Sequence, residues 1–69
     1  MNRTHIDTSI KESNGAQLRA DVYQDSQGYS VEYKIDGQQV KTETYYDKSI
    51  YFVESAVQNW FAGIKTLNG

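Results

Sequence analysis

The sequence predicts an α+β fold, a four-stranded antiparallel β-meander with one C-terminal α-helix packed on one face. Apolar and polar residues alternate with a period of two as far as residue 46, three glycine-containing breaks divide this part into four segments, and the last third changes to a helical period. The chain has 69 residues and contains neither a linker nor a repeat. A single domain over residues 1–69 is therefore expected.

The four predicted strands cover residues 3–12, 16–24, 29–35 and 38–46. They are rich in β-branched and aromatic residues, which is typical of strands with one buried face. The apolar positions are even in the first two segments, odd in the third and even again in the fourth. Since directly opposed residues share a face of a sheet, these parities select how the strands pair.

The connection between the first two strands contains the pair Asn14-Gly15, which favours a two-residue turn. That turn would place Arg19 opposite Ile10 and mix the apolar with the polar face. A three-residue loop over residues 13–15 keeps the faces separate, and we expect it to prevail. The pairs that follow are Ile10 with Leu18 and Ile6 with Val22.

The other two connections agree with the same apolar face. A four-residue loop over residues 25–28 joins the second strand to the third, and Asp36-Gly37 forms a two-residue turn before the fourth. Three hairpins that share one apolar face predict the meander. The pairs expected across the second and third hairpins are Val22 with Val31, Ala20 with Tyr33, Tyr33 with Val40 and Val31 with Thr42.

Residues 48–67 are predicted to form the helix, because apolar residues recur there at steps of three and four. We expect Asp47 to cap its N-terminus, with Tyr46 and Tyr51 as a hydrophobic staple across the cap. Asn68-Gly69 provides the C-terminal stop. The apolar stripe consists of Ile50, Val53, Val57, Trp60, Ile64 and Leu67.

This helix is expected to lie across the apolar face of the sheet, with Trp60 over the small residues Thr8 and Ala20. Its apolar arc spans about 180°, whereas about 100° already covers a helix that faces one sheet. Chains of this length also bury little surface on folding, and this one has no cysteine for a disulfide. We therefore expect a non-enzymatic interaction module that forms a homodimer with itself and binds a further protein partner of unknown identity.

The predicted dimer interface is the helix edge that carries Phe52, Ala56, Asn59 and Gly63. Glycine within a helix costs about 1 kcal/mol relative to alanine, which a close helix contact would explain. Two alternatives stay open. Gly63 lets the helix approach its own sheet, or the dimer forms through sheet edges.

One cross-strand row of the opposite sheet face contains three carboxylates and a lysine: Asp7, Asp21, Glu32 and Lys41. Adjacent carboxylates suit a hard cation such as Mg²⁺ or Ca²⁺. The alternative, which we favour, is a solvated charge lattice in which Arg19, Lys34 and Lys41 neutralise the acids diagonally. No metal and no cofactor is expected.

The composition gives little support for catalysis. There is one histidine, His5, and no cysteine or glycine-rich phosphate loop, and a flat sheet offers no cleft. No apolar run is long enough to span a membrane, and the N-terminus lacks the pattern of a signal peptide. A cytoplasmic protein without enzyme activity is expected.

A four-stranded meander followed by one helix resembles the single-stranded-DNA-binding coactivator and Whirly proteins in topology. The resemblance implies a dimer that binds nucleic acid strands across its sheets, and it carries over no residues because no motif is shared. The alternative function is therefore weak binding of single-stranded nucleic acid, although the formal net charge of −2 opposes phosphate binding. The residues expected to stack bases or meet phosphates are Lys11, Arg19, Tyr23, Lys34, Lys41 and Tyr45.

The C-terminal third, with Lys48-Ser49-Ile50-Tyr51 and the run from Ala56 to Lys65, is similar to small proteins encoded by marine cyanophages, as is the tyrosine-rich hairpin before it. The resemblance implies a phage accessory protein that acts in the host cytoplasm. It implies no particular activity and no functional residues.

Overall fold

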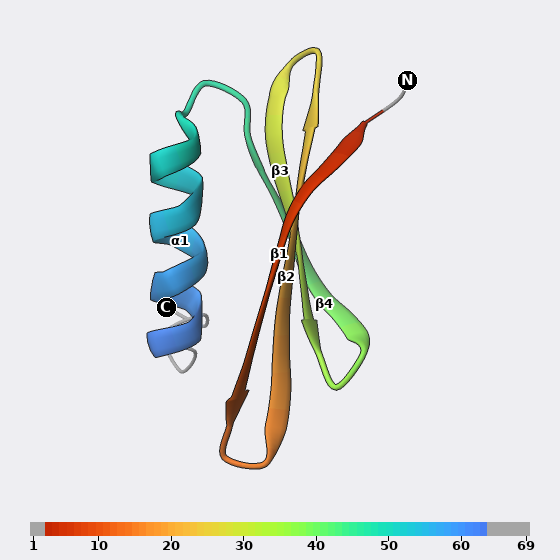
Figure 1. Ribbon diagram of the computed structural model, residues 1–69, viewed down its shortest axis with the longest axis vertical. Helices are drawn as coiled ribbons and strands as arrows, with labels where there is room; N and C mark the ends of the chain where they lie inside the picture. Colours follow the sequence, from red (N-terminus) through yellow and green to blue (C-terminus); the bar gives the residue numbers. More distant parts are fainter. Residues whose placement is uncertain (1–2, 64–69) are drawn as a thin grey trace.

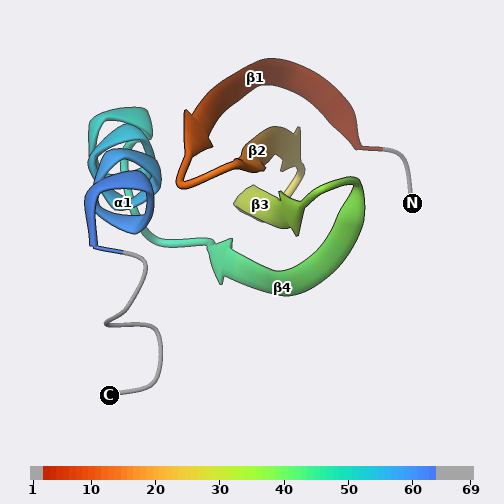
Figure 2. The same ribbon diagram turned by 90° about the horizontal axis from the view of Figure 1, so that it is seen from below.

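The strands and the helix follow one another in the predicted order. The structure is a computed structural model, which describes residues 3–63, and its strands form one antiparallel sheet in the order β1-β2-β3-β4. The helix lies along one face of this sheet (Figure 1), and β1 and β4 bend around the central pair (Figure 2). The α+β class and the meander are thus confirmed. The elements are β1 (Thr4–Ser13), β2 (Ala16–Asp25), β3 (Gly28–Ile35), β4 (Gln38–Tyr45) and α1 (Ile50–Ala62).

The core lies between α1 and the two central strands. Every fully buried apolar residue of the described part belongs to β2, β3 or α1, and none belongs to β1 or β4. The predicted pairing of Val22 with Val31 and of Ala20 with Tyr33 is confirmed. Burial of this apolar surface is the main force that holds the helix on the sheet. The core residues are Leu18, Ala20, Val22, Val31, Tyr33, Val53, Val57, Trp60 and Phe61.

The turn between β1 and β2 differs from the prediction. It has two residues, Asn14 with φ 53° and Gly15 with φ 83°, and not three. A type I′ turn needs positive φ at both positions, and Asn-Gly is the pair that adopts it most readily. As a result Ile10 lies opposite Arg19. The predicted pairs that are wrong are Ile10 with Leu18 and Ile6 with Val22.

This register reverses the two faces of β1. The polar residues Asp7, Ser9 and Lys11 lie on the helix side of the sheet, and Ile10 is 54% exposed on the other side. Ile6 is an extra residue in a β-bulge between His5 and Asp7. The alternation of apolar and polar residues predicts the wrong face for β1 because the core lies between α1 and the central strands. Burial therefore does not decide which face of this edge strand is apolar.

A second bulge changes the pairing of β4. Asp36-Gly37 forms the predicted two-residue turn, with φ 52° and 85°, but Val40 is an extra residue, and Tyr33 pairs with Lys41. Lys41 and Glu43 therefore lie on the helix side of the sheet, where their side chains are 3.3 Å apart. The predicted pairs that are wrong are Tyr33 with Val40 and Val31 with Thr42.

The helix begins after the predicted cap. Ser49, and not Asp47, is the N-cap, because its side chain accepts a hydrogen bond from the backbone N–H of Phe52. The predicted hydrophobic staple of Tyr46 and Tyr51 was placed around a cap at Asp47, so it is wrong as well, and Tyr51 is 78% exposed. The helix ends at Ala62, and the predicted stop at residues 68–69 lies outside the described residues, as do Ile64 and Leu67 of the stripe. Within residues 3–63 no helix has the length and apolar character that crossing a membrane requires.

Trp60 packs on Tyr33, with the two ring centroids 4.7 Å apart. The predicted position of Trp60 over Thr8 is wrong, because Thr8 lies on the opposite face of the sheet. Gly63 is the C-cap of α1, where its N–H donates to the Asn59 carbonyl, so the premise of an interior helix glycine is also wrong.

Gly28 supplies a test of how the helix is positioned. A Cβ at this residue would lie 2.6 Å from the carbonyl oxygen of Tyr46, in the connection that leads from β4 to α1, and its φ of +139° is unfavourable for other residues. Since the clash is with backbone, we expect Gly28→Ala to lower the free energy of unfolding by about 2 kcal/mol or more in urea denaturation.

Gly37→Ala is the matched control for this prediction. Gly37 also has a positive φ, but a Cβ there meets nothing within 4 Å. We expect a loss of about 1 kcal/mol from backbone strain alone. Equal losses in the two variants would contradict the close approach of Gly28 to Tyr46.

Candidate functional site

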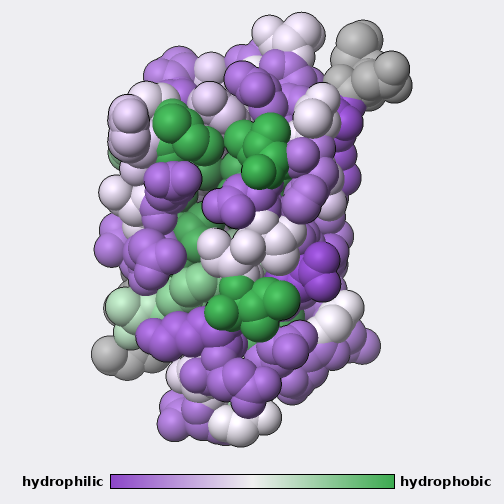
Figure 3. All heavy atoms as spheres, viewed as in Figure 1, coloured by the Kyte–Doolittle hydropathy of each residue, from purple (hydrophilic) through white to green (hydrophobic). Residues whose placement is uncertain are grey.

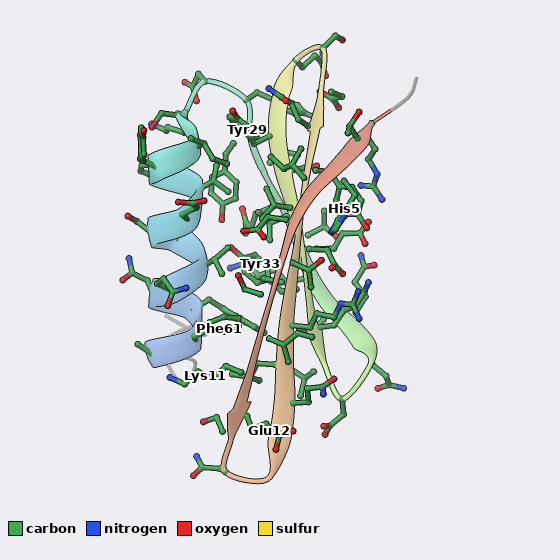
Figure 4. All side chains as sticks on the ribbon, in the orientation of Figure 1. His5, Lys11, Glu12, Tyr29, Tyr33 and Phe61 are labelled. Atoms are coloured by element: carbon green, nitrogen blue, oxygen red, sulfur yellow. The ribbon has the colours of Figure 1, made fainter. Side chains whose placement is uncertain are left out.

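A buried carboxylate lies at the centre of the outer face, which we define as the sheet face turned away from α1. Asp21 occupies the middle of β2, and its side chain is only 2% exposed. In Figure 4, His5 lies on this side of the sheet, whereas Tyr33 and Phe61 lie between the sheet and the helix. A buried charge is stable only with hydrogen-bonding or charged partners, so the neighbours of Asp21 define the site.

Three side chains donate hydrogen bonds to the Asp21 carboxylate. Thr8 Oγ1 donates to Oδ1 at 2.6 Å, and Lys34 Nζ donates to Oδ2 at 2.9 Å. Arg19 Nε reaches both oxygens, at 3.1 and 3.2 Å. The two-residue turn brings Thr8 opposite Asp21, in the position that the sequence pattern had assigned to Asp7.

These bonds control the ionisation of Asp21. Burial disfavours its charged form, but the hydrogen bonds from Thr8, Lys34 and Arg19 outweigh burial and lower the pKa of Asp21 from 3.8 to about 2. The bond to Asp21 likewise raises the pKa of Lys34. Asp21 is therefore a very weak base at neutral pH, which makes it unsuited to general acid–base catalysis.

His5 is connected to Asp21 through Thr8. Its Nε2 lies 2.5 Å from Thr8 Oγ1 and 3.8 Å from Asp21 Oδ1. Because the Thr8 hydroxyl donates its proton to Asp21, it accepts a hydrogen bond from the N–H at His5 Nε2. The imidazole meets the Tyr23 ring edge-on at a centroid distance of 5.4 Å. In this series of hydrogen bonds, His5 donates to Thr8 and Thr8 donates to Asp21, which stabilises the buried charge.

Glu32 of β3 lies opposite Asp21 of β2 and forms an ion pair with Arg3. Arg3 Nη2 donates to Glu32 Oε2 at 2.6 Å, and the Arg3 guanidinium lies 3.9 Å from the centroid of the Tyr23 ring. Lys34 Nζ is 3.7 Å from Glu32 Oε1 and links the two carboxylates. The bond to Glu32 raises the pKa of Arg3.

The predicted charge lattice is present in part, and its central carboxylate is buried where a solvated one was expected. Arg19 and Lys34 bind Asp21 as the diagonal arrangement requires, whereas Lys41 and Asp7 lie on the helix side of the sheet. Within residues 3–63 no three histidine or carboxylate side chains come together as metal ligands.

The residues expected to bind nucleic acid are divided between the two faces. Arg19, Tyr23 and Lys34 lie on the outer face, where Asp21 and Glu32 neutralise the two cations. The other three lie on the helix side, so the six cannot contact one nucleic acid strand together. The residues on the helix side are Lys11, Lys41 and Tyr45.

The predicted helix interface lies along α1 on its β4 side. Phe52 is 46% exposed, and its ring centroid is 5.9 Å from that of Tyr45. Ala56 is half-buried, and Asn59 is exposed. Part of the surplus apolar arc therefore packs on β4 of the same chain. Whether Phe52, Ala56, Asn59 and Gly63 contact a second copy stays a prediction.

A groove of about 290 Å³ lies between β1 and α1, and the sequence analysis did not predict it. Its apolar residues, Val22 and Val57, are buried, and its two carboxylates, Asp7 and Glu54, are exposed. In Figure 3, hydrophobic atoms show at the boundary between the helix and the sheet, with hydrophilic residues around them. The signal that would have found the groove is the Asn14-Gly15 turn, because its register places Asp7 on this side. The groove is lined by Asp7, Ser9, Val22, Glu54, Val57 and Gln58.

Comparison with known protein families, with curated proteins and with solved structures gives no match to this chain. The similarity to cyanophage proteins, the accessory role in a host and the cytoplasmic location therefore stay predictions. The functional argument rests on the geometry of the two sheet faces.

The pKa of Asp21 makes stability dependent on pH. Because the native pKa of about 2 lies below the ordinary value of 3.8, the unfolded chain takes up the proton first as the pH falls. The stabilisation, about 2 kcal/mol, is present above pH 4 and is lost between pH 4 and 2. We expect Asp21→Asn to lower the unfolding free energy by about this amount at pH 7, and by much less at pH 2, in urea denaturation.

Asp47→Asn is the control, because Asp47 is exposed and is not the cap. It should leave the unfolding free energy at pH 7 nearly unchanged. A wild-type protein and an Asp21→Asn variant with parallel pH profiles would contradict the stabilising role of the carboxylate.

Proposed function

We propose that the chain is a small, non-enzymatic interaction module that forms a homodimer through the open edge of β1. The observation that carries the proposal is the edge itself. β1 pairs with β2 on one side, and its other side has no strand beside it among residues 3–63. An unpaired edge presents free backbone donors and acceptors, which another strand can satisfy.

The edge of β1 is more suitable than that of β4. The bulge at Ile6 lies near the start of β1 and leaves residues 7–13 in one regular register, whereas the bulge at Val40 interrupts β4 after its second residue and leaves the shorter stretch 41–45. Bulges protect edges from pairing. Ile10 projects from the middle of the regular stretch and is 54% exposed, which favours its burial in an interface.

The charged residues of the outer face support an interaction module less directly. This outer-face charge cluster consists of Arg3, Arg19, Asp21, Glu32 and Lys34. Its cations already bind Asp21 and Glu32, so it offers little free positive charge to a phosphate backbone. Its central carboxylate has a pKa far from neutrality, so it offers no general base. The cluster therefore stabilises the sheet, and we expect a partner to bind at another surface.

Sedimentation equilibrium tests the dimer. The chain mass is 7.9 kDa, and we expect twice this mass at micromolar concentration. A protein that stays monomeric at about 100 μM, which corresponds to a binding free energy weaker than about −5.5 kcal/mol, would overturn the proposal.

A proline substitution in β1 tests whether its open edge forms the dimer interface. The residues that flank a two-residue turn exchange both backbone hydrogen bonds, and the pairs then alternate, so the N–H of Ile10 points away from β2. Ile10→Pro removes a donor from the edge while the β1–β2 ladder keeps its bonds, and we expect a monomer with an unchanged far-UV circular dichroism spectrum.

The matched control is Thr42→Pro, at an outward position of the β4 edge. It should stay dimeric. A dimer that survives Ile10→Pro but is lost in Phe52→Asp would assign the interface to the helix edge instead.

A further inference from the structure

Two unlike charges of β1 lie on the same side of the strand. Asp7 and Lys11 are four residues apart, and both lie on the helix side of the sheet. Figure 4 shows Lys11 on this side. Within residues 3–63 neither side chain forms a salt bridge, although most other cations there do; the salt-bridged cations are Arg3, Arg19, Lys34 and Lys41. This arrangement is complementary to itself.

We propose, on the basis of the edge dimer above, that two copies pair β1 with β1 in antiparallel orientation around a twofold axis at Ser9. Asp7 of each copy then lies opposite the partner's Lys11, and the contact occurs twice. Directly opposed unlike charges stabilise an antiparallel pair, and like charges destabilise it.

The other symmetric registers lack this match. An axis at Ile10 places Asp7 opposite the partner's Ser13, and an axis at Thr8 places it opposite the partner's Ser9. Axes at Lys11 or at Asp7 oppose two lysines or two aspartates. The axis at Ser9 is therefore the register that charge complementarity selects.

The backbone of β1 is compatible with this register. The N–H and C=O groups of Thr8 and Ile10 point away from β2, because Ser9 and Lys11 make the hydrogen-bonded pairs of the β1–β2 ladder. In the single chain the Thr8 N–H donates to Asp7 Oδ1 at 2.9 Å, so strand pairing replaces this bond with one to the partner strand and releases the Asp7 carboxylate. With the axis at Ser9, Thr8 lies opposite the partner's Ile10, so outward groups meet outward groups. The bulge at Ile6 ends the regular pairing on one side.

The second copy also completes the groove. Asp7 lines the groove together with Glu54 from α1. The partner's Lys11, opposite Asp7, brings an ammonium group to two carboxylates that have no salt bridge among residues 3–63. The apolar floor of Val22 and Val57 suits the methylene stem of a lysine. The occupant that this groove fits is thus the lysine of a second copy.

Charge reversal tests the register. Asp7→Lys and Lys11→Asp each oppose like charges twice, and we expect each to weaken the homodimer at least about tenfold in sedimentation equilibrium. A mixture of the two variants opposes unlike charges again and should form a heterodimer, visible in native mass spectrometry. The double variant Asp7→Lys Lys11→Asp should recover the homodimer.

Glu12→Lys is the control, because it changes the charge of β1 by the same amount as Asp7→Lys but projects to the outer face. It should dimerise like the wild type. Recovery in the mixture also guards against a variant that simply folds poorly, because a misfolded chain would not be rescued by the other. If the wild type dimerises but the mixture shows no preference for the heterodimer, the register is wrong while the edge dimer stands. If the wild type is monomeric, both proposals fail.

Discussion

The register of β1 against β2 is the constraint on which the rest of this molecule depends. The Asn14-Gly15 turn sets it, because positive φ at two consecutive residues allows only the tight hairpin. One side of β1 then presents Thr8 to Asp21, and the other presents Asp7 and Lys11 to the helix side. The cost is an exposed Ile10. Local backbone chemistry thus prevails over the apolar pattern where no core opposes it.

The same register explains why a charge is tolerated in the middle of the sheet. Asp21 is stable because both oxygens are satisfied, and one donor comes from β1 itself. In the register that the apolar pattern favours, Asp7 would lie opposite Asp21 in place of Thr8, so the buried charge would lose a hydrogen-bond donor and face a second carboxylate. The carboxylate therefore helps to specify the pairing of the strands, a role that buried polar groups have in other systems.

The central strands and the edges differ in how far the sequence predicts them. β2 and β3 were predicted in register because α1 buries their apolar face, and this placed Asp21, Glu32, Arg19 and Lys34 correctly. The edge strands were not: the two-residue Asn14-Gly15 turn shifts β1 by one residue from the register that its apolar pattern favours, and in β4 a bulge adds one residue without a recognisable composition. Thr8 and Arg3 were therefore missed as partners in the charge cluster. The cap at Ser49 was missed because Asp47 and Ser49 are both good capping residues, and only the path of the connection decides between them.

Nuclear Overhauser effects between backbone Hα protons test the central claim most directly. In an antiparallel sheet the Hα protons of a non-hydrogen-bonded pair approach each other closely. The two-residue turn predicts strong effects between Ile10 and Arg19 and between Thr8 and Asp21. A strong effect between Ile10 and Leu18, with none between Ile10 and Arg19, would contradict the register and with it the assignment of both faces.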